Sequence, residues 1–252
     1  MELVGDFNVG DYIPWFGWIN LINGQESKLK RVAKELDEYF ETILEEGIQR
    51  KDEKVKGETV MDVLLDLHEK NANGFVLQRE SLNAIILDMF VAGTDTTYTL
   101  LEWALSELVK NNNIMSKLKA EVRRSSGSKL NCITEDNLEE LPYLKAVIKE
   151  TLRMHPPGVL IPRESTNDIN IMGEIRGQNF ELIPFGYGRR SCPGSVFALI
   201  LAEVALANLI LKFDFALPGE TSSSEHLDMR EVPSLVVKRQ TPLVLKATLS
   251  DS

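Results

Sequence analysis

One stretch constrains the fold of this chain more than any other: the almost unbroken apolar run "SVFALILAEVALANLILKF" at residues 195–213. A helix that is apolar on nearly every face lies inside a protein, so this run predicts a buried helix. Pro193 and Gly194 mark its beginning, because proline and glycine punctuate the chain between elements. Glu203 and Asn208 interrupt the run before it reaches the roughly 18 apolar residues of a membrane span. We therefore expect a core helix, and no membrane span in this chain.

Apolar residues recur at helical spacing in several other stretches. The segment 80–110 is apolar nearly all round and is expected in the middle of the protein. Thr134 can serve as an N-cap, Pro142 suits the opening turn of a helix, and Pro156 stops it. Two stretches near the C-terminus, "SLVVKR" and "PLVLKATL", predict a hairpin of two strands. The expected fold is mainly α with small β elements, with helices over 27–50, 59–71, 80–110, two segments within 133–157, and 195–213.

The composition bounds the class of protein. With 252 residues, 43% of them hydrophobic, the chain is long enough for one sizeable core. Its net charge of −10 and its isoelectric point near 5.0 argue against nucleic acid as a main partner. The two cysteines, Cys132 and Cys192, are too few for a disulfide framework, and the sequence shows no secretion signal. We expect a soluble protein of a reducing compartment, without a disulfide.

The segment directly before the apolar run, "PFGYGRRSCPG" at 184–194, combines glycines, arginines and a single cysteine. Beside Arg189 and Arg190 at a helix N-terminus, the Cys192 thiol is expected as a thiolate, because the helix dipole and both cations favour negative charge. A thiolate can serve as a nucleophile, a zinc ligand or a haem ligand. The sequence shows no recognisable catalytic base and no further zinc ligands beside Cys192, whereas a haem iron needs one protein thiolate. The role of haem ligand is therefore favoured for Cys192. It is also favoured over a purely structural role in a turn that is basic by chance.

Polar residues interrupt the long helix predicted at 80–110, in "AGTDTT" at 92–97. Gly93 weakens a helix by about 1 kcal/mol relative to alanine, and a buried acid or hydroxyl is costly unless it is satisfied or used. One interpretation is a local opening lined by Asp95 and Thr96 that holds water and relays protons. The other is a capping break between two helices, and these residues alone do not decide between them.

Glu150 and Arg153 stand three residues apart in "ETLR" and therefore share one face of their helix. On most helices such a pair is a solvated salt bridge of little energetic effect. Apolar neighbours make this helix look half-buried, so we expect the pair to be internal.

These segments resemble a known family, in sequence and in order. AGTDTT, ETLR and "PRES" at 162–165 precede the cysteine loop in the order that the family has, and the flanking sequence looks like its plant microsomal members. The loop resembles the haem-binding signature F-G-x-G-x-R-x-C-x-G of the cytochrome P-450 family, whose fixed positions are here Phe185, Gly186, Gly188, Arg190, Cys192 and Gly194.

The resemblance implies a haem site. Cys192 would be the axial ligand of the iron in haem b (iron protoporphyrin IX). Arg190 and Arg163 would contact the two haem propionates, and Phe185 would pack under the porphyrin. The glycines of the signature would shape the loop around the sulfur.

The resemblance also implies catalytic and substrate-binding positions. Asp95 would feed protons for O–O cleavage, and the Thr96 hydroxyl would bind the dioxygen. Glu150 and Arg153 would be the structural ion pair that braces the haem-binding core. Substrate would touch residues on the long helix, after the prolines and in the turn near the C-terminus: Met89, Ala92, Gly93, Thr97, Val159, Leu160, Val232 and Leu235.

The function that follows is a haem-thiolate monooxygenase. It would oxidise a small lipophilic plant metabolite with dioxygen, using electrons that a separate reductase takes from NADPH. Full-length members are expected on the endoplasmic reticulum membrane. Another possibility is a non-catalytic fragment, inert or acting as an interaction piece. An isomerase or dehydratase of the same fold ranks last, because such members usually lose the acid and alcohol that Asp95 and Thr96 supply.

The chain departs from the family in extent. It corresponds to roughly the C-terminal half of a full-length member, so we expect one partial domain over 1–252 that lacks the membrane anchor and the distal half. The family's meander and P-x-R-F element, which would stand between Gly173 and Glu174, are also expected to be missing. The arginine of that element would complete the network of Glu150 and Arg153.

Overall fold

The structure is a computed structural model of two compact units, Met1–Ala92 and Gly93–Ser252, and each unit is described by itself. The boundary falls within the long helix α6 (Arg79–Lys110), which runs through it without interruption. The residues that the structure describes are 13–16, 18, 24–52, 59–70, 77–126, 132–159, 183–219, 227–232 and 234–250.

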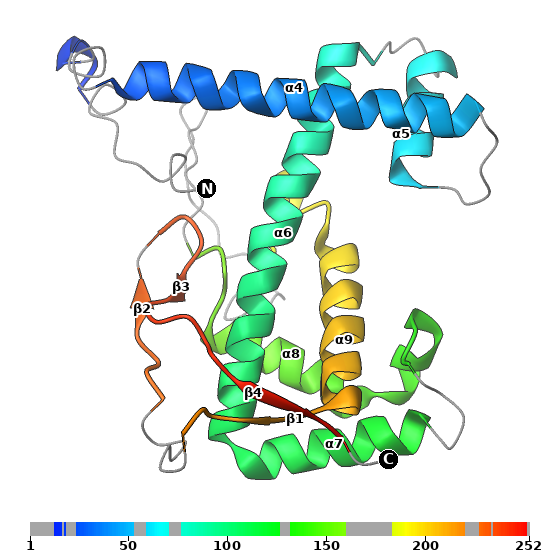
Figure 1. The fold of residues 1–252 in the computed structure, drawn as a ribbon, viewed down its shortest axis with the longest axis vertical. Coiled ribbons are helices and arrows are strands. Elements are labelled where there is room, and N and C mark those ends of the chain that lie inside the picture. Colours follow the sequence, from blue (N-terminus) through cyan, green and yellow to red (C-terminus); the bar gives the residue numbers. More distant parts are fainter. Residues whose placement is uncertain are drawn as a thin grey trace, which may run out of the picture. The chain divides into compact units, whose positions relative to one another are not determined.

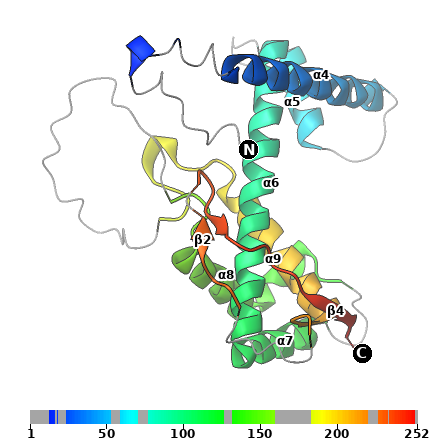
Figure 2. The same cartoon turned by 60° about the vertical axis from the view of Figure 1, so that its left-hand side comes forward.

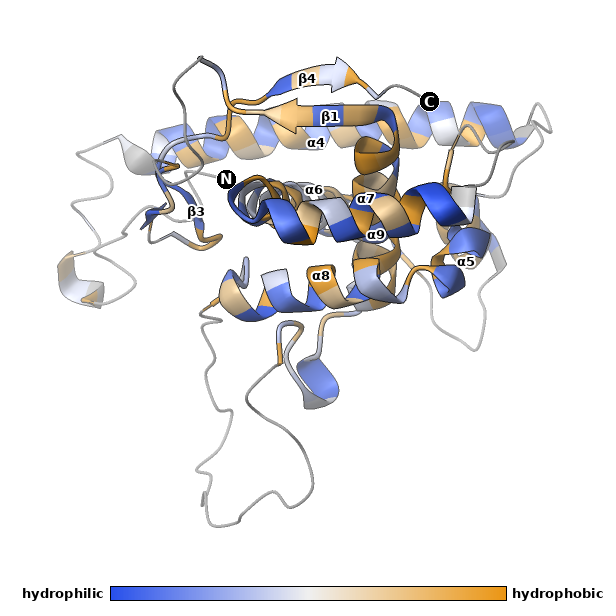
Figure 3. Ribbon diagram, turned by 90° about the horizontal axis from the view of Figure 1, so that it is seen from below, coloured by the Kyte–Doolittle hydropathy of each residue, from blue (hydrophilic) through white to orange (hydrophobic). Residues whose placement is uncertain are grey.

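The first unit is built on an amphipathic helix. α4 (Gln25–Asp52) alternates hydrophilic and hydrophobic residues along its length (Figure 3), and Phe40 and Leu44 on its apolar stripe are buried. α5 (Val60–Lys70) packs against α4 so closely that a Cβ at Gly47 would come within 2.6 Å of Met61 Cγ. The two helices and the start of α6 enclose a small core of Leu44, Leu65, Leu77 and Leu82, and a short 3-10 helix, η1 (Pro14–Phe16), lies earlier in the chain.

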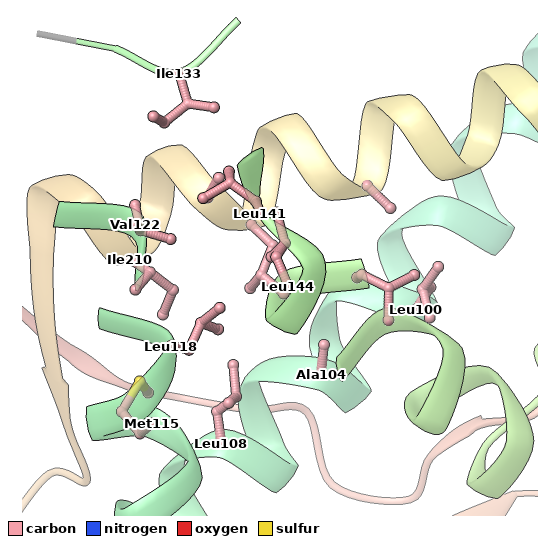
Figure 4. Packing of buried hydrophobic residues seen from close by; sticks show 14 of the residues in the cluster. Leu100, Ala104, Leu108, Met115, Leu118, Val122, Ile133, Leu141, Leu144 and Ile210 are labelled. Carbon is pink, nitrogen blue, oxygen red and sulfur yellow. The ribbon is translucent and has the colours of Figure 1, made fainter. Parts of the chain in front are cut away.

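The second unit contains the larger core. Side chains of α6, α7 (Asn112–Ser126), α8 (Pro142–Met154) and α9 (Ser195–Lys212) meet in one cluster (Figure 4). Figure 2 shows these helices gathered around the C-terminal part of α6. Leu108, Leu118, Leu144, Leu206 and Ile210 are all at most 1% exposed there. This unit therefore has a core large enough to hold its helices in place.

Most of the predicted helices are found within a few residues of their expected bounds. The first segment within 133–157 is the 3-10 helix η4 (Glu135–Glu140), where Thr134 and Asn137 form a capping box. α8 begins at Pro142, as expected of proline in a first helical turn, and ends with His155 as its C-cap. The continuous α6 excludes a capping break at AGTDTT. α7 was not predicted.

The predicted hairpin was wrong, because its two strands pair with other segments and not with each other. β4 (Lys246–Leu249), from "PLVLKATL", pairs antiparallel with β1 (Phe213–Ala216), which directly continues α9 (Figure 1). β3 (Lys238–Arg239), from "SLVVKR", pairs instead with β2 (Glu231–Val232). The partner of β4 is therefore a distant segment, the strand that directly follows α9. The alternation of apolar and polar residues near the C-terminus could not identify this partner.

α9 is the helix that the opening apolar run predicted. Among the described residues it is also the one helix whose length and composition would allow it to cross a membrane, although core helices of soluble proteins meet the same criteria. Its buried residues Ala202, Leu206, Ala207 and Ile210 belong to the core of the second unit.

Candidate functional site

The cysteine loop is closed by its own backbone. The Cys192 N–H donates to the Phe185 carbonyl at 2.9 Å, and the Ser191 N–H donates to the Gly188 carbonyl at 3.0 Å around the short helix η5 (Gly188–Arg190). Gly186 and Gly188 have φ values of 70° and 82°, in the left-handed region that disfavours residues with a side chain. The two glycines of the signature are therefore required by the path of the backbone.

The Cys192 thiol is presented at the surface of the second unit. Cys192 is exposed and free, and a Cβ at Gly194 would lie 3.9 Å from its sulfur. Arg190 is exposed in the same loop, whereas Phe185 packs against the large core and anchors the loop to it. The Ala198 N–H donates to the Gly194 carbonyl at 2.8 Å, which begins α9 directly after the loop.

These residues fit a haem better than another metal centre. In the described part of the chain, no group of three or more His, Cys, Asp or Glu side chains could hold a metal ion. A zinc site needs three or four such ligands, whereas a haem iron needs one axial thiolate from the protein. The exposed sulfur of Cys192 could provide that single ligand.

The AGTDTT segment lies on α6, and its acid has a partner that the sequence did not reveal. The Lys238 ammonium lies 2.9 Å from Asp95 Oδ1 and 2.8 Å from Oδ2, and the two side chains are 38% and 20% exposed. The two residues are 143 positions apart, so no local pattern could have paired them. A Cβ at Gly93 would meet no atom within 4 Å, so there is open space beside the segment.

Two hydroxyls of this helix are buried without a hydrogen bond. Thr97 is 8% and Thr99 0% exposed, and their Oγ1 atoms have no partner within the described structure. Thr96 is half-buried. Nearby, burial raises the pKa of Tyr98, and the neighbouring Glu102 carboxylate raises it further. A buried hydroxyl without a hydrogen bond is costly, so a polar partner at either hydroxyl would lower the free energy of the folded state.

Glu150 and Arg153 form a bidentate ion pair, with Nε–Oε2 and Nη2–Oε1 distances of 2.8 and 2.7 Å. The hydrogen bonds from Arg153 lower the pKa of Glu150. The expectation that the pair is internal is wrong, because the side chains are 56% and 54% exposed. α8 turns Leu144, Ile148 and Leu152 toward the core, and the pair stands on its other side.

The remaining predicted residues divide into three groups. Met89 and Ala92 belong to the first unit. Val159, Val232 and Leu235 belong to the second unit and are 54%, 39% and 41% exposed. Arg163, predicted to bind a propionate, and Leu160, predicted to contact substrate, lie outside the described residues, as does the junction of Gly173 and Glu174.

Comparison with known proteins shows the family. The sequence model described as cytochrome P-450 matches residues 2–176 and 173–246. Norfluorocurarine oxidase from Strychnos sp is 40% identical over 97% of this chain. (+)-Menthofuran synthase from Mentha piperita and tabersonine/lochnericine 19-hydroxylase from Catharanthus roseus are each 39% identical over 98% of it. The chain spans 57–58% of the length of these relatives.

Proposed function

The chain belongs to the cytochrome P-450 family, and from this premise we propose that it provides the thiolate side of a haem-thiolate monooxygenase. One observation carries the proposal: an exposed Cys192 in a loop that two left-handed glycines shape and that Phe185 anchors to the core. The reaction class is the insertion of one atom of dioxygen into a small organic substrate.

The chain's own residues would hold the haem from one side. Cys192 would bind the iron through its sulfur as a thiolate, the form in which cysteine ligates a metal. Arg190 would pair with one propionate and Arg163 with the other, as guanidinium groups do with carboxylates. A haem held by these residues would supply the redox chemistry that activates dioxygen.

Asp95 and Thr96 would handle protons. Lys238 holds the Asp95 carboxylate in one place through both of its oxygens. Asp95 would accept a proton from water at one of these oxygens and pass it toward the Thr96 hydroxyl, which would donate to the oxygen substrate. The open space beside Gly93 leaves room for that water.

The substrate would be a small lipophilic plant metabolite. Among the relatives are proteins named as oxidases or hydroxylases of norfluorocurarine and of tabersonine or lochnericine, and a menthofuran synthase. The substrate would contact the unpaired Thr97 hydroxyl on α6 and the apolar Val232 and Leu235 near β2. Electrons would come from NADPH through a separate reductase, at the endoplasmic reticulum membrane.

The test is the carbon-monoxide difference spectrum of the chain after reconstitution with haem and reduction. We expect the long-wavelength Soret band that is characteristic of a cysteine thiolate. Cys192→Ala should abolish that band, while Cys132→Ala, which removes the other exposed free thiol, should leave it unchanged. A band typical of a neutral or histidine ligand in the unaltered chain would instead favour a fragment without catalysis.

A further inference from the structure

Outside the site described above, His155 joins three segments of the second unit. It is the C-cap of α8, and its side chain is 11% exposed. Its Nδ1 atom lies 2.9 Å from Glu231 Oε1 on β2, and its Nε2 atom lies 3.1 Å from Glu107 Oε1 on α6. Both ring nitrogens therefore face a carboxylate.

The plane of the imidazole ring is fixed by an aromatic neighbour. The fully buried Trp103 stacks on His155 with ring centroids 3.9 Å apart and an interplanar angle of 2°. Trp103 Nε1 donates to the Val237 carbonyl at 3.3 Å, and the Val237 N–H donates to the Pro157 carbonyl at 2.9 Å. The turn between β2 and β3 is thus tied to α6 and to the end of α8 around this ring.

The two contacts of His155 determine how many protons the ring must carry. A neutral imidazole has one N–H donor and one acceptor nitrogen, whereas an ionised carboxylate only accepts. With Glu107 and Glu231 ionised, both contacts are hydrogen bonds only when the ring is the doubly protonated imidazolium. Loss of one proton turns one of the two bonds into a repulsive contact between lone pairs.

Charged groups of α6, β2 and β3 lie around the ring and its aromatic neighbour. Glu107 on α6 and Glu231 on β2 face it directly, and the Arg239 guanidinium on β3 lies 5.5 Å from the centre of the Trp103 ring. Arg239 is 5% exposed and donates to the Asp228 carbonyl at 2.7 Å. The Asp228 carboxylate is paired with Arg230, which lowers its pKa. Glu107 and Glu231 are thus the carboxylates that face the ring directly.

We propose that His155 is a positioning residue, which as an imidazolium between Glu107 and Glu231 fixes the turn between β2 and β3 and releases it as the pH rises. Val232 and Leu235 lie in or beside that turn, so the effect on substrate binding rests on the proposed function. The stabilisation of the turn by His155 is argued only from contacts within the second unit. It can therefore be tested without haem or substrate.

The first test is His155→Phe in the full chain, since phenylalanine can still stack on Trp103 but makes neither hydrogen bond. Thermal unfolding is followed by circular dichroism at several values between about pH 5 and pH 8, the range in which histidine titrates in proteins. Near pH 5 the unfolding midpoint of the unaltered chain should be about 3–6 °C higher than that of the variant. This difference should become smaller toward pH 8. A difference that does not change with pH would contradict the proposal.

A second variant covers the case in which His155→Phe does not fold. Glu231→Gln keeps the shape of the side chain, and its amide can donate to a neutral imidazole. The proposal predicts that this variant folds with most of the pH dependence of the unaltered chain removed. Glu139→Gln, at an exposed glutamate of η4, is the matched control and should retain it. Equal pH dependence in the two glutamate variants would overturn the proposal.

Stabilisation of the turn is measured by the protection of its amides against hydrogen exchange. The amides of Val237 and Gln240 bond to the Pro157 and Arg230 carbonyls. Their protection factors, which correct for the base-catalysed intrinsic rate, should fall several-fold at the alkaline end or in Glu231→Gln at acidic pH. The protection factors of amides in the buried half of α9 should not change. Loss of haem binding in Cys192→Ala would leave these results unchanged, so the two proposals fail separately.

Discussion

The two halves of α9 are equally apolar in sequence and differ in what covers them. In the C-terminal half, Ala202, Leu206 and Ile210 are each 0% exposed. In the N-terminal half, Val196 and Phe197 are 67% and 64% exposed. The C-terminal half of the helix is therefore part of the core, whereas the first turn after Cys192 exposes Val196 and Phe197.

This difference connects the fold to the proposed site. Large exposed apolar side chains that gather in one place mark a surface that binds something. The exposed half of α9 continues directly from the cysteine loop, which is the position that a flat apolar group such as haem would cover. The buried half holds the loop in place from behind, through the same core that Phe185 joins.

Truncation of one side chain in each half is the sharpest test of this comparison. Leu206→Ala should lower the free energy of unfolding by about 2–5 kcal/mol, because it leaves a cavity in the core. Phe197→Ala should change it by no more than about 0.5 kcal/mol, as at other exposed sites. The free energy of unfolding of both variants is measured by denaturant titration in the absence of haem. Equal losses in the two variants would mean that the exposed half is covered in solution.

An intermediate effect is expected at Glu203, where the two halves meet. Glu203 is 7% exposed, and burial raises the pKa of its carboxyl, although Lys145 and Lys149 oppose the shift. Because the pKa of Glu203 is raised in the folded state, ionisation of its carboxyl destabilises the fold at neutral pH. This penalty disappears as the pH falls through the folded-state pKa toward the ordinary pKa of a glutamate carboxyl.

Glu203→Gln should therefore stabilise the chain by about 1 kcal/mol at neutral pH, the scale of one poorly satisfied buried polar group. The gain should shrink as the pH approaches the unfolded carboxyl pKa. Thermal midpoints of the two proteins measured across that range check the sign. A variant that is less stable at neutral pH would show that the Glu203 carboxylate is well paired.

The smallest effect is expected at Glu150, on the solvent side of α8. Its ion pair with Arg153 is more than half exposed, so water screens it. Glu150→Gln should lower the free energy of unfolding by no more than about 0.5 kcal/mol. A loss as large as that of Leu206→Ala would show that the pair is buried in solution, contrary to the structure.

Much of the helical fold could be predicted from the sequence. α4, α6, α8 and α9 carry strong apolar periodicity or an apolar run, and Pro142 marks the beginning of α8. The strand pairing could not be predicted, because β4 pairs with β1, a strand far from it in sequence that follows α9. The exposure of Glu150 was also missed, since apolar neighbours in sequence do not show which face of a helix they occupy.

The loop around Cys192 was the most predictable part of the site. Its glycines, arginine and cysteine are all local in sequence, and the positive φ angles of Gly186 and Gly188 explain why glycine stands there. Lys238 beside Asp95 and the carboxylates around His155 could not be foreseen, because each contact joins residues at least 48 positions apart. The tertiary structure alone brings such groups together.

Amide hydrogen exchange along α9, with and without haem, decides whether the exposed half of this helix binds the haem. We expect slow exchange at Leu206–Ile210 in both states, because the core covers these residues whether or not haem is bound. At Cys192–Ala198 we expect faster exchange in the haem-free chain and strong protection once haem is bound. Protection at Cys192–Ala198 that haem leaves unchanged would contradict the claim that this half of α9 and its cysteine loop form the haem-binding face.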